Sequence, residues 1–417
     1  MRDVTPRTGG LAFAGLLVFI FLVYANPGNW FEGMEDVGFA KIAAGFASVA
    51  LLGSWLLYGR KLTLGGWPGL ALIGLFAIVG FSALWSYWPS YSVATFLEGI
   101  KYLAICLVVA NVIDSKQRLH GIIAALAWAS LIPAIGCISS WSHGEHLVDG
   151  DRAGWIGIFG NPNDLAYYLA VGVAMVLSAR EAASRRIMKV AYLGLLVPIG
   201  VAILLTQSRG GMLAAGAVLA LWTLRSVKRA PALIGIAIAL GCVLYLGPSN
   251  TFGHRMETAQ SHGVDLSAQG RLDAWRTGLN IAAERPWTGV GAGAFMIAWP
   301  DFAPGDAGAA RTEHNTFIQL IGELGIPALL LFVLALVAGV LAVSRAAKQA
   351  YLAPYARGVQ CGLAGFAVCS LFGGIAFTWP IYLLLGISFA TARLAREDAV
   401  PIVDREAART LQLAGAH

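Results

Sequence analysis

Charged residues are scarce in this chain. Asp, Glu, Lys and Arg make up only 12% of the 417 residues, whereas an average soluble protein contains about 25%. Hydrophobic residues make up 58%, and the mean hydropathy is +0.69. The short segments of alternating hydrophobicity that are typical of a transmembrane β-barrel are missing as well. The composition therefore excludes an ordinary soluble protein and predicts an all-α polytopic membrane protein.

Cysteine patterns that would indicate disulfides or a metal site are also missing. The five cysteines all fall inside apolar runs, and none belongs to a CxxC pair or lies beside histidines at metal-ligand spacing. They are expected to be small buried hydrophobic residues. The chain contains no internal repeat and no low-complexity tract.

Long apolar runs fill most of the sequence. Crossing a bilayer takes about 20 mostly apolar residues, and the chain offers about twelve such segments. The first is expected to be an anchor, because no small-x-small cleavage site follows it and a second span comes at once. The predicted spans are about 10–25, 37–58, 67–87, 93–113, 119–141, 163–179, 187–206, 209–225, 230–247, 315–344, 356–376 and 378–393.

The distribution of Lys and Arg predicts the orientation of these spans. Basic residues gather in alternate connections, such as Arg180–Lys189 and Arg225–Arg229, and in both terminal segments. Cytoplasmic loops carry such an excess, so both termini are predicted to be cytoplasmic. The chain then divides into nine spans (1–247), a large external loop with helices (248–313), three further spans (314–393) and a cytoplasmic tail (394–417).

The external loop is too long to be structureless in a compact protein. Within it, Leu272, Trp275 and Leu279 recur at helical spacing, and Pro286 would end the helix. A helix is therefore predicted from Gln269 up to Pro286. The glycines of Gly289–Phe295 follow no predicted strand, so they are not a dinucleotide fingerprint and instead predict a tight turn.

Lys41, Glu98 and Lys101 are charged residues within predicted spans. Glu98 precedes Lys101 by three residues, so the two share a helix face. They predict an ion pair inside the bundle, with a functional role as the alternative, since charges within membranes are often functional. Lys41 lies near the outer end of its span, where its long side chain can reach the membrane surface.

Arginines on the external side are candidates for anion binding. Arg209 lies in the short turn Thr206–Gly211, at the N-terminus of a predicted helix, where backbone N–H groups attract anions. A simple interfacial anchor is the alternative. Arg271 lies near the start of the predicted external helix, where a cation is mildly unfavourable, which hints at a function. Arg276 follows five residues later and is not on the same face.

The other external connection also carries polar candidates. Arg152 is followed by the turn Gly160-Asn-Pro-Asn-Asp164, which contains Asn163. Pro162 suits the first position of a helix after an Asn cap. The run His143–Asp151 contains two histidines and two aspartates that could ligate a divalent cation. Its spacing is not specific, so a solvated loop is the favoured interpretation.

An ionisable cluster immediately precedes the span that starts near residue 315. Asn315 or Thr316 can cap this helix. His314 is then either a residue that merely precedes the cap or a general base, because histidine titrates near neutrality and a helix N-terminus favours its neutral form. Glu313 is a second candidate base.

These motifs occur in an order that resembles the O-antigen ligase/polymerase family. The motif region covers about residues 150–330. The segments that carry the resemblance are Ser208-Arg-Gly210, Gly270-Arg-Leu-Asp-Ala-Trp275, Pro286-Trp-Thr-Gly-Val-Gly-Ala-Gly-Ala-Phe295 and His314-Asn-Thr-Phe-Ile-Gln-Leu-Ile-Gly-Glu-Leu-Gly325.

The resemblance implies an inverting glycosyltransferase with a GT-C-like fold in the bacterial inner membrane. Such an enzyme takes a polysaccharide from undecaprenyl pyrophosphate and joins it to lipid A–core oligosaccharide on the periplasmic face, without a metal, another cofactor or a nucleic-acid partner. The family's essential residues would fall on Arg209, Arg271 and His314, with His314 as the base. The expected substrate-binding set adds Arg152, Arg276, Asn163, Glu313 and Asn315.

Other functions stay open at this point. An O-antigen polymerase or a protein O-oligosaccharyltransferase would share the same motifs. A transporter of lipid-linked glycans would need ionisable residues near the middle of the membrane together with broken helices. Only Glu98 and Lys101 meet the first of these requirements.

Overall fold

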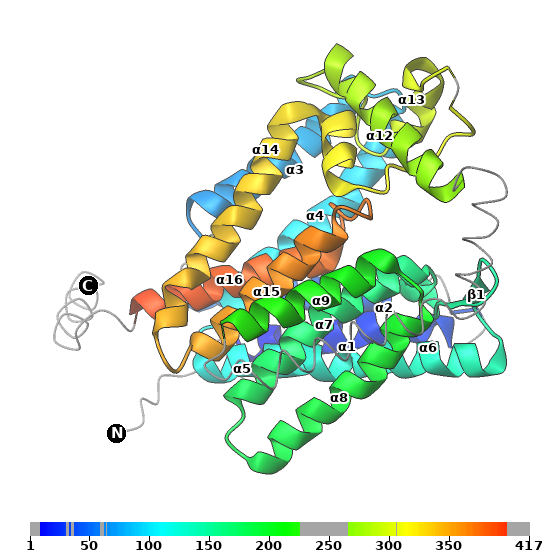
Figure 1. Ribbon diagram of the computed structural model, residues 1–417. Coiled ribbons are helices and arrows are strands. Elements are labelled where there is room, and N and C mark those ends of the chain that lie inside the picture. Colours follow the sequence, from blue (N-terminus) through cyan, green and yellow to red (C-terminus); the bar gives the residue numbers. More distant parts are fainter. Residues whose placement is uncertain are drawn as a thin grey trace, which may run out of the picture.

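The computed structural model of the chain describes residues 9–30, 33–34, 37–58, 62–63, 65–225, 266–305 and 307–397. Within them the fold is almost entirely helical (Figure 1). The one sheet in this part of the chain pairs two residues of β1 (Leu147–Val148) with two of β2 (Arg152–Ala153), antiparallel. The predicted all-α fold is confirmed.

The helices follow the predicted segments closely. In chain order they are α1 (Gly10–Ala25), η1 (Pro27–Asn29), α2 (Phe39–Tyr58), α3 (Trp67–Phe81), η2 (Ser82–Leu84), α4 (Pro89–Val112), α5 (Lys116–Ala129), α6 (Leu131–His143), η3 (Gly157–Phe159), α7 (Pro162–Ala182), α8 (Arg186–Leu205), α9 (Arg209–Leu224), α12 (Leu266–Glu284), α13 (Phe295–Phe302), α14 (Thr316–Ser344), η4 (Ala346–Lys348), α15 (Ala353–Cys369) and α16 (Trp379–Glu397).

Eight segments of the described chain are long and apolar enough to cross a membrane, which makes this a polytopic membrane protein. They comprise α1, α2, α3, α4, α7, α8, α14 and the nearly continuous pair α5–α6. The predicted spans at α9, α15 and α16 are helices too, but α9 is shorter, and α15 and α16 do not meet the criteria of length and apolarity. The predicted span 230–247 lies outside the described residues.

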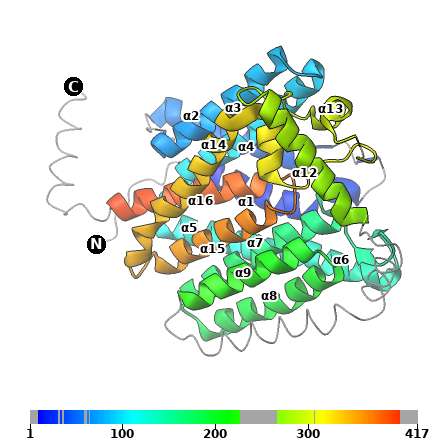
Figure 2. The ribbon, with the colours of Figure 1, turned by 45° about the horizontal axis from the view of Figure 1, so that its top comes forward.

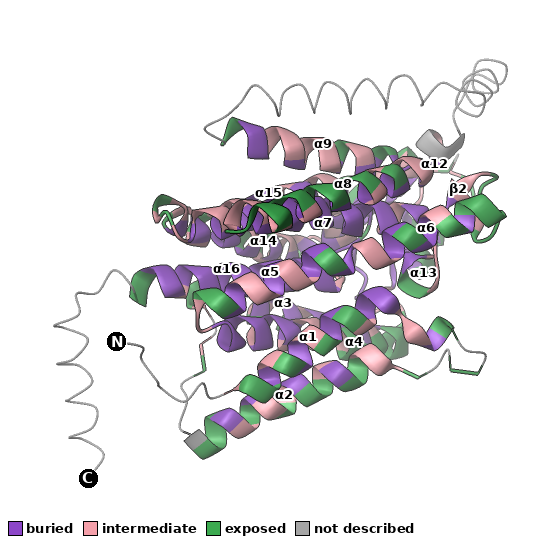
Figure 3. Cartoon of the chain, turned by 90° about the horizontal axis from the view of Figure 1, so that it is seen from below, coloured by how far each residue is buried: buried purple, intermediate pink, exposed green. Residues whose placement is uncertain are grey.

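Burial explains why α16 can be more polar than a lipid-facing helix. Nearly all of its residues are buried, from Trp379 to Ala395, because other helices surround it. Helix α7 is equally enclosed, whereas α2 and α8 expose large apolar side chains such as Leu57 and Ile187. Figure 3 shows exposed residues on both α2 and α8. Exposed apolar faces suit lipid contact, and a helix in the middle of the bundle does not need one.

A small helical unit caps one end of the bundle. Helices α12 and α13 share their own apolar core, and α12 lies along the first half of α14 (Figure 2). The helix predicted from Gln269 up to Pro286 is thus confirmed as α12, which ends before Pro286 as expected. We call this end of the bundle, where α12, the β1–β2 hairpin and the start of α14 meet, the α12 end. The core residues are Ala274, Ile281, Val290, Ala294, Phe295, Ala298, Trp299 and Phe302.

A break in α14 receives the glycine-rich turn. Gly325 has φ of 79° and interrupts the helix just before Pro327, which leaves carbonyl groups without their helical donors. The carbonyl oxygens of Gly322 and Glu323 accept hydrogen bonds instead from the backbone N–H groups of Val290 (3.0 Å) and Gly291 (2.8 Å). The motifs around Gly291 and Gly325 therefore form one structural unit.

The same turn is fixed on its other side by the connection between α3 and α4. The N–H of Tyr87 donates to the carbonyl of Val290 (2.9 Å), and the indole of Trp85 donates to the carbonyl of Thr288 (2.9 Å). The turn thus links two membrane helices to the α12–α13 unit. This bonding makes it a rigid connector.

We expect Gly291→Ala to destabilise the protein. Gly291 has φ of 100°, and a Cβ atom there would collide with Ser86. Residues forced into such conformations cost about 1–3 kcal/mol, so the melting temperature in detergent should fall. The control is Gly194→Ala in the middle of α8, where a Cβ atom has nothing within 4 Å and alanine favours the helix. Equal melting temperatures for the two variants would contradict the connector role.

Candidate functional site

A cavity of about 460 Å³ opens at the α12 end. Four segments that are far apart in the sequence build it: the β1–β2 hairpin, the start of α7, the start of α12, and the residues before α14. Its lining residues are Val148, Asp149, Arg152, Gly160, Asn161, Pro162, Asn163, Arg271, Arg311 and His314. The structure thus brings together four of the residues predicted from the sequence: Arg152, Asn163, Arg271 and His314.

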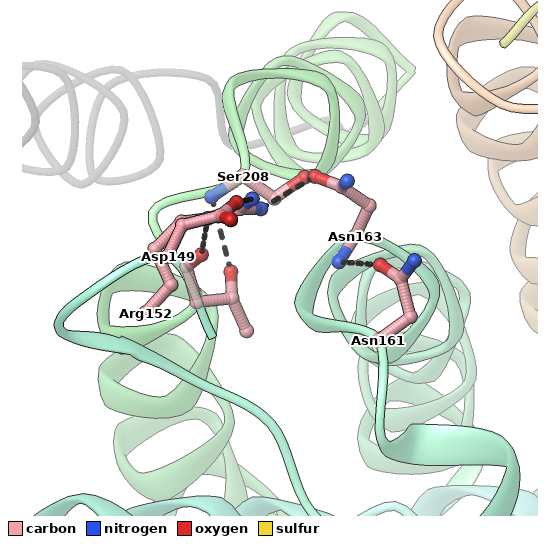
Figure 4. Close-up of polar contacts among 6 residues, drawn as sticks. Asp149, Arg152, Asn161, Asn163 and Ser208 are labelled. Carbon is pink, nitrogen blue, oxygen red and sulfur yellow. Dashed lines mark hydrogen bonds and ion pairs between the residues drawn. The ribbon is translucent and has the colours of Figure 1, made fainter. Parts of the chain in front are cut away.

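Arg152, at the start of β2, organises one wall of the cavity. Its side chain is only 12% exposed. Its guanidinium donates to the carbonyl of Thr206 (3.1 Å), to Oδ1 of Asn163 (2.8 Å) and to the carboxylate of Asp149 (3.2 Å) (Figure 4). One arginine therefore fixes the hairpin, α7 and the α8–α9 turn relative to one another. Asn163 has a defined role as its partner.

Two helix caps fix the neighbouring turns. The Asn161 side chain accepts a hydrogen bond from the N–H of Asn163 (2.8 Å), and Pro162 occupies the first helical position, as predicted. The Ser208 hydroxyl accepts from the N–H of Gly211 (3.2 Å) at the start of α9. Arg209 follows this cap and is exposed, and it is not among the residues that line the cavity.

Arg271 and Arg311 form the opposite wall. Arg271 lies in the first part of α12 and is half-buried, whereas Arg311 is exposed at the cavity rim. A Cβ atom on Gly270 would lie 2.6 Å from Nη1 of Arg311, so the guanidinium of Arg311 packs against the backbone of α12 at this point. The glycine before Arg271 is therefore what lets the second arginine approach.

His314 faces these two arginines. It is half-buried, its φ of 47° turns the chain into α14, and its Nε2 lies 3.3 Å from the Thr312 hydroxyl. Burial lowers the pKa of His314, and the positive charges of Arg271 and Arg311 lower it further. Both causes disfavour the imidazolium, so the imidazole is neutral near pH 7 and able to accept a proton.

Asn315 and Glu313, on either side of His314, lie outside the cavity lining. Asn315 is buried and caps α14 by accepting from the N–H groups of Phe317 (2.9 Å) and Ile318 (3.2 Å), as one of the predictions had it. Glu313 is also buried, next to the Glu323 carboxyl, and burial raises its pKa. A buried cap and a buried acid hold the backbone that presents His314.

The remaining candidates are placed elsewhere. Arg276 projects from α12 with a side chain that is 56% exposed, forms an ion pair with Asp273 (3.6 Å), and does not line the cavity. The His143 ring forms a hydrogen bond with the carbonyl of Ser139 (2.8 Å). The carboxylate of Asp149 accepts a hydrogen bond from Arg152. In the part of the chain that the structure describes, no three His, Cys, Asp or Glu side chains gather as a metal site would require.

The charge of the cavity favours an anionic ligand. Three guanidinium groups, those of Arg152, Arg271 and Arg311, face it, and Asp149 is the one carboxylate among its lining residues. A guanidinium group can donate two parallel hydrogen bonds to two oxygens of one phosphate. Arg311 is not among the residues that the sequence predicts for the site. Only its contact with Gly270, which is remote in sequence, places it at the rim.

Comparison with known proteins agrees with this chemistry. Residues 194–333 match the family model described as O-antigen ligase. This segment of the chain is similar to O-antigen ligases. The matched segment begins within α8 and ends in α14, so it contains Arg209, Arg271 and His314. The predicted resemblance to this family is confirmed.

A curated relative extends the likeness beyond the domain. The chain is 26% identical over 330 residues to the exopolysaccharide production protein ExoQ of Rhizobium meliloti, and the match covers 71% of each chain. The family match and this relative indicate an enzyme of the O-antigen ligase/polymerase type that acts in polysaccharide assembly.

Proposed function

We propose that this protein transfers a glycan from undecaprenyl pyrophosphate to a sugar hydroxyl of lipid A–core oligosaccharide, at the periplasmic face of the inner membrane. The observation that carries the proposal is the cavity itself. At one end of a membrane-spanning bundle it gathers three arginines around a single histidine of lowered pKa. Lipids held by the bundle would present their head groups at this level.

The arginines fit the leaving group. As the glycosidic bond breaks, negative charge grows on the pyrophosphate, and fixed cations stabilise it without reorganising. Arg152 is held in place by the carbonyl of Thr206 and the side chain of Asn163. Arg271 and Arg311 approach from the opposite wall. A pyrophosphate between the two walls would contact both.

The reaction is a single displacement. The acceptor oxygen attacks the anomeric carbon and forms the new C–O bond while the C–O bond to the pyrophosphate breaks. The electron pair of that bond leaves with the pyrophosphate oxygen, and the proton of the acceptor hydroxyl passes to the His314 imidazole. Attack from the face opposite the leaving group inverts the configuration. A neutral imidazole suits this role.

The pH dependence of transfer should report the environment of His314. Because His314 must be neutral to accept a proton and its pKa is lowered, the rate should fall only at a pH below the ordinary histidine pKa of about 6.5. Arg311→Gln removes one of the charges that lower this pKa, so the acid limb should move to higher pH. Rates measured from pH 4.5 to 8 test this. An unmoved limb would argue against His314 as the titrating base.

Transfer should also survive chelation of divalent metals. The arginines supply the positive charge that a cation would otherwise bring to a pyrophosphate. We expect purified protein treated with EDTA to keep its full rate. A loss that added divalent cation restores would revive the region His143–Asp151 as a metal site.

A second candidate is polymerisation, in which the acceptor is another lipid-linked glycan. The relative's name supports it, since that protein serves the production of an exopolysaccharide. A strain that lacks the protein distinguishes the two. Finished polymer that accumulates on its lipid carrier indicates a ligase, whereas accumulated single repeat units indicate a polymerase.

A further inference from the structure

A second group of charges lies away from the cavity, on α2 and α4. The same oxygen of Glu98, Oε1, accepts from Lys41 of α2 (3.3 Å) and from Lys101 one turn further along α4 (2.5 Å). The predicted Glu98–Lys101 pair is confirmed, but its predicted place inside the bundle is wrong. The side chains of Lys41, Glu98 and Lys101 are 64%, 53% and 40% exposed, respectively.

The surface around these residues is apolar. Ile42 and Phe46 of α2 and Leu97 and Ile100 of α4 all expose their side chains. Such a face suits acyl chains, in which bare charges are unfavourable and rare. The three charged residues therefore need a polar neighbour on their open side.

The position along the helices places this neighbour at head-group level. The first turns of α4 pack against the glycine-rich turn, with the Ser92 hydroxyl donating to the carbonyl of Ala292 (2.8 Å) and Gly293 packed on Tyr91. They belong to the unit that caps the α12 end. Glu98 comes about 9 Å beyond Ser92 along the helix, level with Lys41 in the first turn of α2. The three charged side chains thus lie where α2 begins to cross the membrane.

We propose that Lys41 and Lys101 bind the phosphate group of a membrane lipid, in the leaflet on the side of the α12 end. Two ammonium groups and one carboxylate leave a net charge of +1, and each ammonium keeps donors beyond the bond to Glu98. Acyl chains of the same lipid would cover Ile42, Phe46 and Leu97. An anionic phospholipid and a lipid-linked pyrophosphate share this phosphate chemistry.

The test is lipid binding by the purified full-length protein. Native mass spectrometry measures the binding of added phosphatidylglycerol, phosphatidylcholine or undecaprenyl pyrophosphate. Lys41→Gln and Lys101→Gln should each weaken phosphatidylglycerol binding about fivefold. Glu98→Gln should strengthen it, because the net charge rises from +1 to +2. Lys189→Gln, at an exposed lysine of α8, is the matched control and should have no effect.

The opposite sign expected for Glu98→Gln separates binding from folding. Three variants that melt earlier but bind lipid as the wild type does would show a purely structural ion network and overturn the proposal. A second copy of the chain seated on this face, seen as a dimer that the variants dissociate, would overturn it too. Binding of undecaprenyl pyrophosphate alone would identify a donor site, and equal binding of both anionic lipids a general one. Neither outcome depends on whether the cavity catalyses transfer.

Discussion

Replacement of Arg271 by alanine should lower glycan transfer about 10²–10³-fold, the usual cost of losing one preorganised donor to a developing anion. Arg271 is half-buried in the cavity wall and close enough to His314 to lower its pKa. Its loss removes charge stabilisation from the leaving pyrophosphate. The measurement is the initial rate of transfer by purified protein with saturating donor, which reports the transition state and not donor capture alone.

Arg276→Ala provides the matched comparison for Arg271→Ala. Arg276 lies on the same helix, carries the same charge and is 56% exposed, but it pairs with Asp273 and does not line the cavity. We expect its rate to stay within about threefold of the wild type, since surface ion pairs contribute little. Equal losses of transfer rate in the two variants would mean that transfer depends on the total charge of α12. The position of Arg271 in the cavity would then have no special role.

Replacement of His314 should have an effect at least as large. A positioned general base contributes about 10²–10⁴-fold, so His314→Ala should leave almost no transfer. His314→Asn is the sharper variant, because asparagine tolerates the φ of 47° at this position but is not a base. The glycan attached to acceptor, measured in membranes of a deletion strain that carries each variant, gives the readout.

The melting temperature controls for the fold of the His314 variants. Asn315 still caps α14 in His314→Asn, so a melting temperature near that of the wild type is expected. A stable His314→Asn protein that attaches glycan at the normal rate would remove histidine from the reaction.

Local features of the site could be predicted from the sequence. Helix α12, the Asn161 and Asn315 caps and the first-position Pro162 depend on neighbours a few residues away. The meeting of Arg152, Arg271 and His314 depends on tertiary packing that no local pattern encodes. Only the resemblance to a family placed Arg271 and His314 in one site.

Other features needed the three-dimensional arrangement. The role of the glycines at 289–293 depends on the break at Gly325, because the backbone groups of the two segments form hydrogen bonds with each other. The apolarity of a predicted span depends on its neighbours as well. Helix α16 is enclosed by protein and carries polar residues that a lipid-facing helix would avoid. Glu98 and Lys101 were expected to face inward because charges avoid lipid, but they lie outward.

The most direct test is a reconstituted reaction with purified protein in nanodiscs, labelled undecaprenyl-pyrophosphate-linked glycan, and acceptors that include lipid A–core. We predict that the wild-type protein releases one undecaprenyl pyrophosphate for each glycosidic bond formed, with inverted configuration at the anomeric carbon. His314→Asn should yield neither product. Transfer by His314→Asn at the wild-type rate, or a product of retained configuration, would contradict the account.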